Sequence, residues 1–374
     1  MSSDGAKMQW LLCLVFVVGQ SWFITGQLYE YHYIKESKNW TAAQKYCRQR
    51  YTDLATISNM TDLDRLNDSA KKRTESAWIG LHSLNNTNPT WHWSLHGLEF
   101  NESETNWGEG EPNNARRNEN CGGINKNLTW LDLSCHETRR FICYDEGKPK
   151  RLIFSQQRMN WSEGQSYCRK EHTDLASGLE QLNDTELRNL AEKIRSWSDV
   201  YIGLFRDTWS WSDGSSFSFR RWNNLAGITM EEDRCAVMKE DGEWETDNCN
   251  EKKPFFCYDD KVILVKLNLT WEDALYYCRE NHRDLVSITD LNDQRWVQER
   301  VKNATTEFVW TGLRYTCTLD FWFWVGGEVV TYHNVDSGEK GDHCDMSGAM
   351  ERAGKHKWFK INDMQEFNFL CSEW

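Results

Sequence analysis

The chain has 374 residues and a formal net charge of −13 at pH 7, with 44 Lys and Arg against 57 Asp and Glu. This balance argues against a nucleic-acid partner and against a polybasic membrane anchor, because both need clustered cations. With 39% hydrophobic and 27% charged residues, the chain has the composition of a globular protein that is long enough for two or three domains.

The first 26 residues are typical of an export signal. Lys7 precedes the apolar run Trp10–Gly19, and small residues such as Gly26 follow it. An uncleaved anchor is the alternative, but the polar pair Gln20 and Ser21 ends the run short of a bilayer span, which favours cleavage near Gly26. No later segment is long and apolar enough to cross a membrane. We therefore predict a secreted, extracellular protein.

Acceptor sites for N-linked glycans support this localisation. Ten N-x-S/T sequons in an exported chain predict a glycoprotein in which these asparagines are exposed. The sequons begin at Asn39, Asn59, Asn67, Asn85, Asn101, Asn127, Asn160, Asn183, Asn268 and Asn303.

Three segments of the chain repeat one pattern. In each, a Trp stands seven residues before a Cys, and an Asp-Leu pair begins six residues after that Cys. A W-I-G-L or related segment, a W-x-W segment and a closing Phe-x-Cys or Phe-Leu-Cys follow. The first cysteines of the copies are Cys47, Cys168 and Cys278, and the last are Cys143, Cys257 and Cys371.

The distance between copies is that of whole domains. Cys47 and Cys168 are 121 positions apart, and Cys168 and Cys278 are 110 apart, which is far longer than the period of a solenoid repeat. Short polar joints follow the first two copies. We predict, after the signal, three tandem domains over residues 27–145, 151–258 and 260–374.

Each copy predicts two helices followed by a mainly antiparallel sheet, which is an α+β fold. The first helix is expected to be capped by Thr41, Ser162 or Thr270. The second helix is expected over Leu63–Lys72, Leu187–Ile194 and Asn292–Val301, with Thr61 and Thr185 as caps of the first two. The W-I-G-L and W-x-W segments alternate as half-buried strands do, and a long loop region follows them.

The repeated tryptophans are interpreted as core residues. A ligand-stacking role is the alternative, but a large ring buries much apolar area, and these residues keep a fixed distance from the cysteines. The interpretation covers Trp40, Trp161, Trp271 and the W-x-W pairs.

Twelve cysteines remain after the signal, which contains Cys13. The first two copies have four each, and four cysteines allow three pairings between which the sequence does not choose. Zinc is rejected because no C-x-x-C motif is present and export favours oxidation. The third copy has Asp363 where a partner for Cys344 is expected, and it gains Cys317. A Cys317–Cys344 bridge is therefore expected, with two free thiols as the alternative.

These residues together resemble the C-type lectin-like domain family, three times over almost the whole mature chain, in the manner of the macrophage mannose receptor group. The resemblance implies three disulfide-stapled α+β domains, in which the first cysteine pairs with the last and the second with the third. The implied bridges are Cys47–Cys143, Cys121–Cys135, Cys168–Cys257, Cys235–Cys249 and Cys278–Cys371.

The resemblance also implies a calcium site in the long loop of the first copy. Glu111-Pro112-Asn113 matches the family's E-P-N motif, which is linked to mannose-type sugars, and Pro112 matches its cis-proline. Glu119, two residues before a cysteine, and Asp132 match further ligands. Carboxylate and amide oxygens suit calcium. Glu111, Asn113, Glu119 and Asp132 are thus the expected calcium ligands, and Glu111, Asn113 and Glu119 the expected sugar contacts.

This sequence departs from the family pattern at Leu131, where the family has an Asn ligand, so the calcium cofactor is in doubt. The second copy has Trp244-Glu-Thr and the third Trp358-Phe-Lys at the corresponding place. Neither supplies the paired oxygens that calcium needs. No sugar-type calcium site is expected in these two copies.

Three functions compete. The first is calcium-dependent binding of glycans or glycoproteins through the first domain. The second is a calcium-independent scaffold for protein ligands, which Leu131 favours. The third is glycoside cleavage by Glu109 and Glu111, which stand two positions apart without a supporting catalytic set. We expect no catalysis.

Overall fold

The computed structural model describes residues 27–71, 73–83, 89–95, 98–115, 118–145, 151–182, 185–193, 198–222, 234–317, 321–336, 344 and 346–373. The expected signal peptide and the joint at residues 146–150 lie outside them. Residues 31–260 form one compact unit, and residues 27–30 with 261–373 form another. Among the described residues, no helix is long and apolar enough to cross a membrane.

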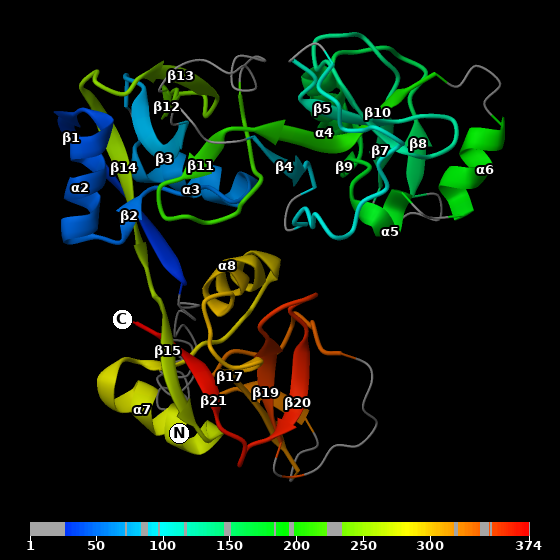
Figure 1. The fold of residues 1–374 in the computed structure, drawn as a ribbon. Coiled ribbons are helices and arrows are strands. Elements are labelled where there is room, and N and C mark those ends of the chain that lie inside the picture. The colour runs from blue at the N-terminus through cyan, green and yellow to red at the C-terminus, as the bar shows by residue number, and fades with distance from the viewer. Residues whose placement is uncertain are drawn as a thin grey trace, which may run out of the picture. The chain divides into compact units, whose positions relative to one another are not determined.

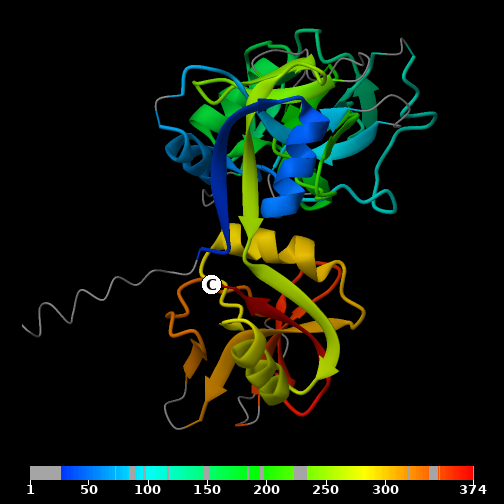
Figure 2. The ribbon, with the colours of Figure 1, turned by 90° about the vertical axis from the view of Figure 1, so that its left-hand side faces the viewer.

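The third repeat folds on itself. Its sheet has the order β15-β21-β17-β19-β20, with β16 paired to β21 and β18 to β17. Helix α7 packs on β15, β17 and β21, as Figure 2 shows, and Trp271, Trp310 and Phe369 fill the core. The elements are β15 (Val262–Leu269), α7 (Trp271–Asn281), β16 (Asp284–Leu285), α8 (Leu291–Val301), β17 (Phe308–Thr316), β18 (Phe321–Trp324), β19 (Met346–Glu351), β20 (Trp358–Asn362) and β21 (Phe367–Ser372).

The unit of residues 31–260 contains two lobes. The first lobe has the same strand arrangement as the third repeat, in the order β1-β14-β3-β12-β13, with β2 on β14 and β11 on β3. Its elements come from both ends of the unit, so in Figure 1 the blue α2 and β3 lie with the yellow-green β12 and β14. They are β1 (Tyr29–Lys38), α2 (Trp40–Arg50), β2 (Asp53–Leu54), α3 (Met60–Ser69), β3 (Ala77–Ser83), β11 (Trp209–Trp211), β12 (Arg234–Met238), β13 (Trp244–Asn248) and β14 (Lys253–Asp260).

The second lobe is built from the middle of the unit. Its strands run β4-β10-β5-β6 and β8-β7-β9, and a parallel bridge from Phe141 to Tyr201 joins the two groups. Its elements are β4 (Thr90–Trp93), β5 (Cys121–Ile124), β6 (Trp130–Leu133), β7 (Ile142–Tyr144), β8 (Leu152–Phe154), α4 (Trp161–Glu171), β9 (Asp174–Leu175), α5 (Gly178–Leu182), α6 (Thr185–Lys193) and β10 (Val200–Asp207).

The first two repeats therefore exchange halves. The W-x-W strand pairs with the W-I-G-L strand in one register throughout, but in the unit of residues 31–260 the two partners come from different repeats. The equivalent pairs are Leu313 with Trp324 in the third repeat, Leu81 with Trp211 in the first lobe and Leu204 with Trp93 in the second. The cores mix in the same way, since Trp40 and Trp78 pack with Phe255.

The connection between β10 and β11 gives a physical reason for the exchange. Thr208 is the only residue between them, whereas a hairpin needs a loop of about two residues or more. These strands cannot fold back on each other, so each pairs with a strand of the other repeat. In the third repeat, residues 317–320 separate β17 from β18, and those strands do pair. A connection too short to close favours exchange of elements.

Two of the expected disulfides are wrong for this reason. Cys47 pairs with Cys257 rather than Cys143, and Cys143 pairs with Cys168. Each bridge still joins the first helix of a lobe to the closing strand of that lobe, but the helix and the strand come from different repeats. The other expected bridges are present: Cys121–Cys135, Cys235–Cys249, Cys278–Cys371 and Cys317–Cys344.

In the third repeat, an ion pair stands at the positions of the Cys235–Cys249 bridge. By strand register, Ser347 and Asp363 stand where the first lobe has Cys235 and Cys249. Arg314 joins the two, donating to Ser347 Oγ at 3.0 Å and to the Asp363 carboxylate. A charge-assisted hydrogen bond thus stands in place of a covalent link.

The helices begin earlier than expected because Asn is the preferred cap at three of them. The Asn39 and Asn160 side chains accept from the backbone N–H groups of Ala42 and Glu163, each at 2.9 Å, so Thr41 and Ser162 are not the caps. Asn59, not Thr61, caps α3. Thr270 caps α7 as expected.

The first-helix tryptophans are core residues, as expected. Each begins its helix and donates its indole N–H to a carbonyl of a W-I-G-L strand, at 2.8 to 2.9 Å. Trp40, Trp161 and Trp271 are 6%, 2% and 4% exposed. In the W-x-W pairs, Trp91 and Trp322 are only half-buried.

The exchanged disulfides predict how the chain responds to a cut in the first joint. If residues 146–150 are replaced by a protease site and cleaved, the two fragments should stay linked without reductant, through Cys47–Cys257 and Cys143–Cys168, and separate with it. Non-reducing electrophoresis measures this. Separation without reductant would show pairing within each repeat.

Lengthening the short connection should reverse the exchange. Five residues inserted after Thr208 raise the Leu204-to-Trp209 spacing to the ten positions found between Leu81 and Trp91, which leaves room for a hairpin. Disulfide mapping by mass spectrometry should then find Cys47–Cys143 and Cys168–Cys257. Unchanged bridges would contradict the proposed cause, and the same insertion within residues 146–150 is the control.

His92 should make the unit sensitive to acid. It lies on β4, 3.6 Å from Asp207 of β10, and burial lowers its pKa to about 4, although Asp207 acts in the opposite direction. The unfolded chain binds a proton below about pH 6.5 and the folded chain does not. The free energy of unfolding should therefore fall between pH 6.5 and 4, by up to about 3 kcal/mol.

The measurement is denaturant unfolding at pH 7 and pH 4.5. His92→Gln should reduce the loss of stability, whereas His136→Gln, at an exposed position, should not. Equal losses in the wild type and in His92→Gln would contradict this assignment.

Candidate functional site

The long loop of the first repeat leads into β5 in the second lobe. Its start is tied to β6, because Trp130 N donates to Asn106 O and Gly108 N to Trp130 O, both at 2.8 Å. Gly110 has a φ of 79°, which favours glycine, and the Glu111–Pro112 bond is cis. We call residues 106–120 the site loop; residues 116 and 117 lie outside the described part.

The structure brings the four expected ligands together around Asp132. Its Oδ1 accepts from Asn113 N at 2.9 Å and its Oδ2 from Asn114 N at 2.8 Å. Its own backbone N–H points to Glu111 Oε2 at 3.4 Å, and Asn113 Nδ2 donates to Glu111 Oε1 at 2.6 Å. Glu119 Oε2 accepts from Ala115 N at 2.7 Å. The fully buried Asp132 side chain thus holds the centre of the loop.

Arg206, which the sequence did not indicate, completes the cluster. It comes from β10 of the second repeat and donates to Asp132 Oδ2 at 2.9 Å, to Glu119 O at 2.9 Å and to Asn120 Oδ1 at 3.2 Å. Its guanidinium lies over the Trp91 ring, 4.8 Å from the centroid. The signal that could have found it is the short Leu204-to-Trp209 spacing, which changes the partner of β10.

The charged form of Glu111 is disfavoured at the partly exposed edge of the cluster. Burial raises the pKa of Glu111 above its usual value, and the neighbouring Asp132 carboxylate raises it further, against opposing hydrogen bonds from the backbone. Two carboxylates that disfavour each other's charge are stabilised by a cation. Arg206 supplies a cation to Asp132. The Glu111 carboxyl lies next to Asn113, whose side chain is exposed.

The donor atoms suit calcium in kind but are incomplete in number. Glu111, Asn113 and Glu119 carry the kinds of oxygen that calcium prefers, but both Glu111 oxygens accept hydrogen bonds within the loop. Both Asp132 oxygens do so too, one of them also from Arg206, and Leu131 supplies no side-chain oxygen. Calcium takes six to eight oxygens. Among the described residues, no three His, Cys, Asp or Glu side chains are grouped closely enough to hold a metal.

In the other lobes, the two residues after the equivalent tryptophan, which correspond to Leu131 and Asp132, make other contacts. Glu245, on β13, lies 3.5 Å from Lys239, and Lys360, on β20, lies over the Trp322 ring. These side chains are held by cations or aromatic rings.

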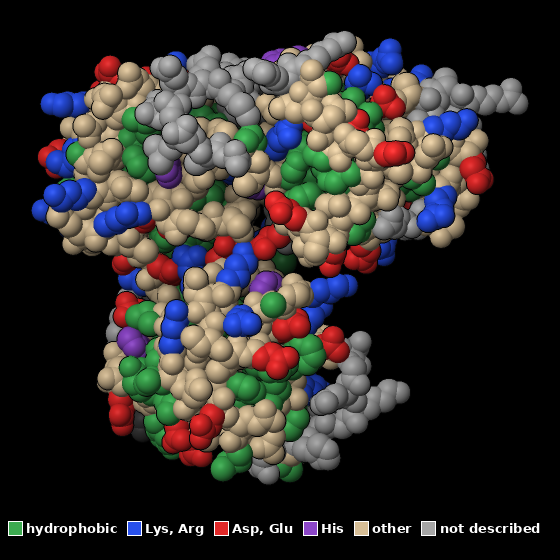
Figure 3. Space-filling view, viewed as in Figure 1, with side chains coloured by type: hydrophobic (Ala, Val, Ile, Leu, Met, Phe, Trp, Pro, Cys, Tyr) green, Lys and Arg blue, Asp and Glu red, His purple; other side chains and the backbone are tan. Residues whose placement is uncertain are grey.

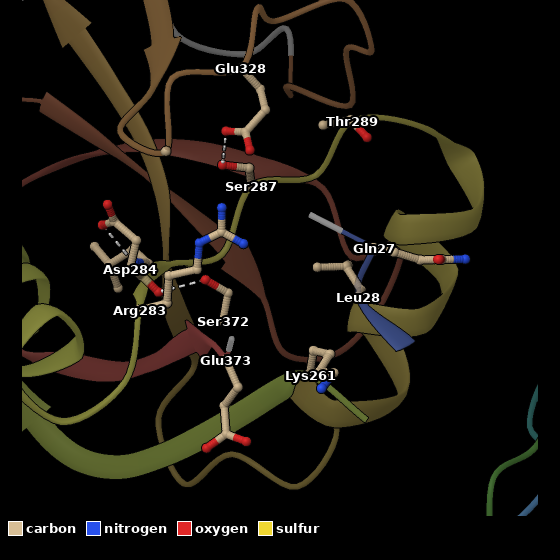
Figure 4. Close-up of a pocket in the computed structure, with 12 residues that line it drawn as sticks. Gln27, Leu28, Lys261, Arg283, Asp284, Ser287, Thr289, Glu328, Ser372 and Glu373 are labelled. Atoms are coloured by element: carbon tan, nitrogen blue, oxygen red, sulfur yellow. Dashed lines mark hydrogen bonds between the residues drawn. The ribbon is translucent and has the colours of Figure 1, made fainter. Parts of the chain in front are cut away.

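Other cavities lie away from the site loop. Figure 4 shows one in the unit of the third repeat, where Ser287 donates to Glu328 beside Arg283. At about 70 Å³ it is too small for a sugar. A cavity of about 550 Å³ in the other unit has Arg169 and Arg220 on its wall, but these are paired with Asp174 and Asp207. Neither cavity is lined by any of the four residues that the sequence predicts as calcium ligands.

The sequons differ in exposure. Asn101, Asn127, Asn268 and Asn303 are exposed as expected, but the Asn59 side chain is buried, 5% exposed, because it caps α3. The expectation of exposure is therefore wrong at Asn59. Asn85 and Asn183 lie outside the described residues.

The Lectin C-type domain family matches the chain over residues 36–145, 157–259 and 267–373. The chain belongs to this family, as three tandem C-type lectin-like repeats with an α+β fold. The family is one of carbohydrate-binding lectins.

Individual relatives are more distant. C-type mannose receptor 2 of Homo sapiens is 22% identical over 379 residues, covering 85% of this chain and 25% of the receptor. L-selectin of Rattus norvegicus is 34% identical over 119 residues, covering 30% of this chain and 31% of the selectin. The chain thus spans about a quarter of the receptor. The solved structure of human lithostathine has 22% identity and a TM-score of 0.28, covering 30% of this chain and 81% of that one.

Proposed function

We propose that this protein binds mannose-type glycans in a calcium-dependent manner through the site loop, with no such site in the second and third repeats. The observation that carries the proposal is the convergence of Glu111, Asn113, Glu119 and Asp132, which are spread over 22 positions of the sequence, into one hydrogen-bonded cluster. The resemblance to the mannose receptor supports the same class of ligand.

The side chains have separable roles in this proposal. Glu111, Asn113 and Glu119 hold the cation and bond to sugar hydroxyls, since carboxylates accept and a carboxamide both accepts and donates. Calcium, when bound, supplies further coordination to the hydroxyls. Asp132 holds the loop backbone.

A calcium-independent scaffold for protein ligands is the second candidate. The engaged Asp132 and the apolar Leu131 favour it, because both reduce the oxygens available to a cation. Figure 3 shows acidic and basic side chains interspersed on the viewed face of the unit of residues 31–260, a surface that suits a soluble protein. Both candidates are binding functions without catalysis.

We further propose that the protein is secreted and carries glycans at the exposed sequons Asn101, Asn127, Asn268 and Asn303. The apolar N-terminal segment and the six disulfides support an oxidising, extracellular setting. Deglycosylation should lower the mass of the expressed chain at these four positions.

The calcium mechanism is tested on the full chain, because the lobes share their halves. Binding to immobilised mannose-rich glycans should require millimolar calcium, since extracellular modules bind calcium at roughly 10⁻⁴–10⁻³ M. EGTA should abolish it, and Glu111→Gln with Asn113→Asp should weaken it by at least roughly tenfold, about 1.4 kcal/mol.

Glu109→Gln is the matched control, because Glu109 is exposed in the same loop and outside the cluster. It should bind as the wild type does. Glycan binding that persists in EGTA would overturn the calcium mechanism, and an absence of glycan binding would leave the protein scaffold.

A further inference from the structure

The exchange of halves changes which residue faces Asp132. Strand register makes Arg206 of β10 equivalent to Ser83 of β3, since His82 pairs with Cys235 and Phe205 with Cys121. If the first repeat closed on itself, Ser83 would stand beside the site loop. In the observed fold, Ser83 lies in the first lobe, 2.6 Å from Thr208 Oγ1.

Arg206 contacts the site loop at several points along its length. Besides Asp132, it binds the carbonyl of Glu119 and the side chain of Asn120, and its backbone N–H donates to Asn120 O at 2.8 Å. Its side chain is 12% exposed and that of Asp132 is 0% exposed. Nearly buried, charge-assisted bonds of this kind are the stronger ones.

We propose that Arg206 is the built-in cation of the site loop. By pairing with Asp132 and holding the Glu119–Asn120 segment, it keeps the loop in its ligand-binding arrangement without calcium. It is a positioning residue contributed by the second repeat to a site of the first. The inference rests on the proposed location of the site, but it requires neither glycan nor calcium.

The consequence for calcium follows from electrostatics. A guanidinium on Asp132 satisfies the charge that a divalent ion would otherwise neutralise, and it repels such an ion. A cation at this site must therefore bind through Glu111, Asn113 and Glu119 and leave Asp132 to Arg206.

The test is hydrogen exchange of the full chain in EGTA, read by mass spectrometry over residues 111–120. Arg206→Ser, which installs the residue of the equivalent strand, should speed exchange at Asn113 and Asn114, whose amides bond to Asp132, by roughly tenfold or more. Arg206→Gln keeps a stem over Trp91 and should have the same effect if Arg206→Ser folds poorly. Arg206→Lys should have a smaller effect.

Arg50→Ser is the control, because Arg50 is exposed on α2 of the first lobe; exchange over residues 111–120 should be unchanged. Slow exchange in both Arg206→Ser and Arg206→Gln would overturn the inference. If the wild type binds no glycan, the proposed function is wrong, but the hydrogen-exchange measurement still tests the role of Arg206. If glycan binding is sensitive to chelator but the Arg206 variants leave hydrogen exchange unchanged, the inference about Arg206 is wrong and the proposed function stands.

Discussion

The architecture of the unit of residues 31–260 depends on one short connection. With Thr208 alone between them, β10 and β11 cannot form the hairpin that β17 and β18 form in the third repeat. Each strand therefore pairs with the other repeat, and the disulfides and cores follow. The result is two lobes that each need residues from both repeats, so neither repeat can be removed without loss of both cores.

The same constraint determines the electrostatics of the site. The site loop belongs to the first repeat, but the strand beside it comes from the second, and that strand carries Arg206 where the first repeat has Ser83. A largely buried guanidinium pairs with Asp132, so the most deeply buried carboxylate of the cluster already has a cationic partner. The loop is held from both repeats, and the proposed function places its ligand at the edge formed by Glu111, Asn113 and Glu119.

The third repeat provides an internal comparison for both effects. It has the same strand order as the first lobe from one continuous segment, which shows that the exchange leaves the fold of a lobe unchanged. It also lacks a bridge equivalent to Cys235–Cys249, and Arg314 contacts Ser347 and Asp363 at those positions. An arginine thus pairs with an aspartate of the same lobe in both cases, Arg206 with the buried Asp132 and Arg314 with the partly exposed Asp363.

The sequence by itself determined the repeat, the α+β fold and the tryptophans of the first helices as core residues, because these depend on local spacing and on side-chain type. The four residues that converge at the site loop were indicated by the resemblance of their segments to a family motif. It did not determine which repeat supplies each half of a lobe. Cys143 and Cys257 each close a repeat in a Phe-x-Cys segment, so the sequence allows either of them as the disulfide partner of Cys47. That choice was made by the length of a connection, whose effect appears only when strands must pair in space. Arg206 was missed for the same reason, because its contact with Asp132 exists only in the exchanged fold.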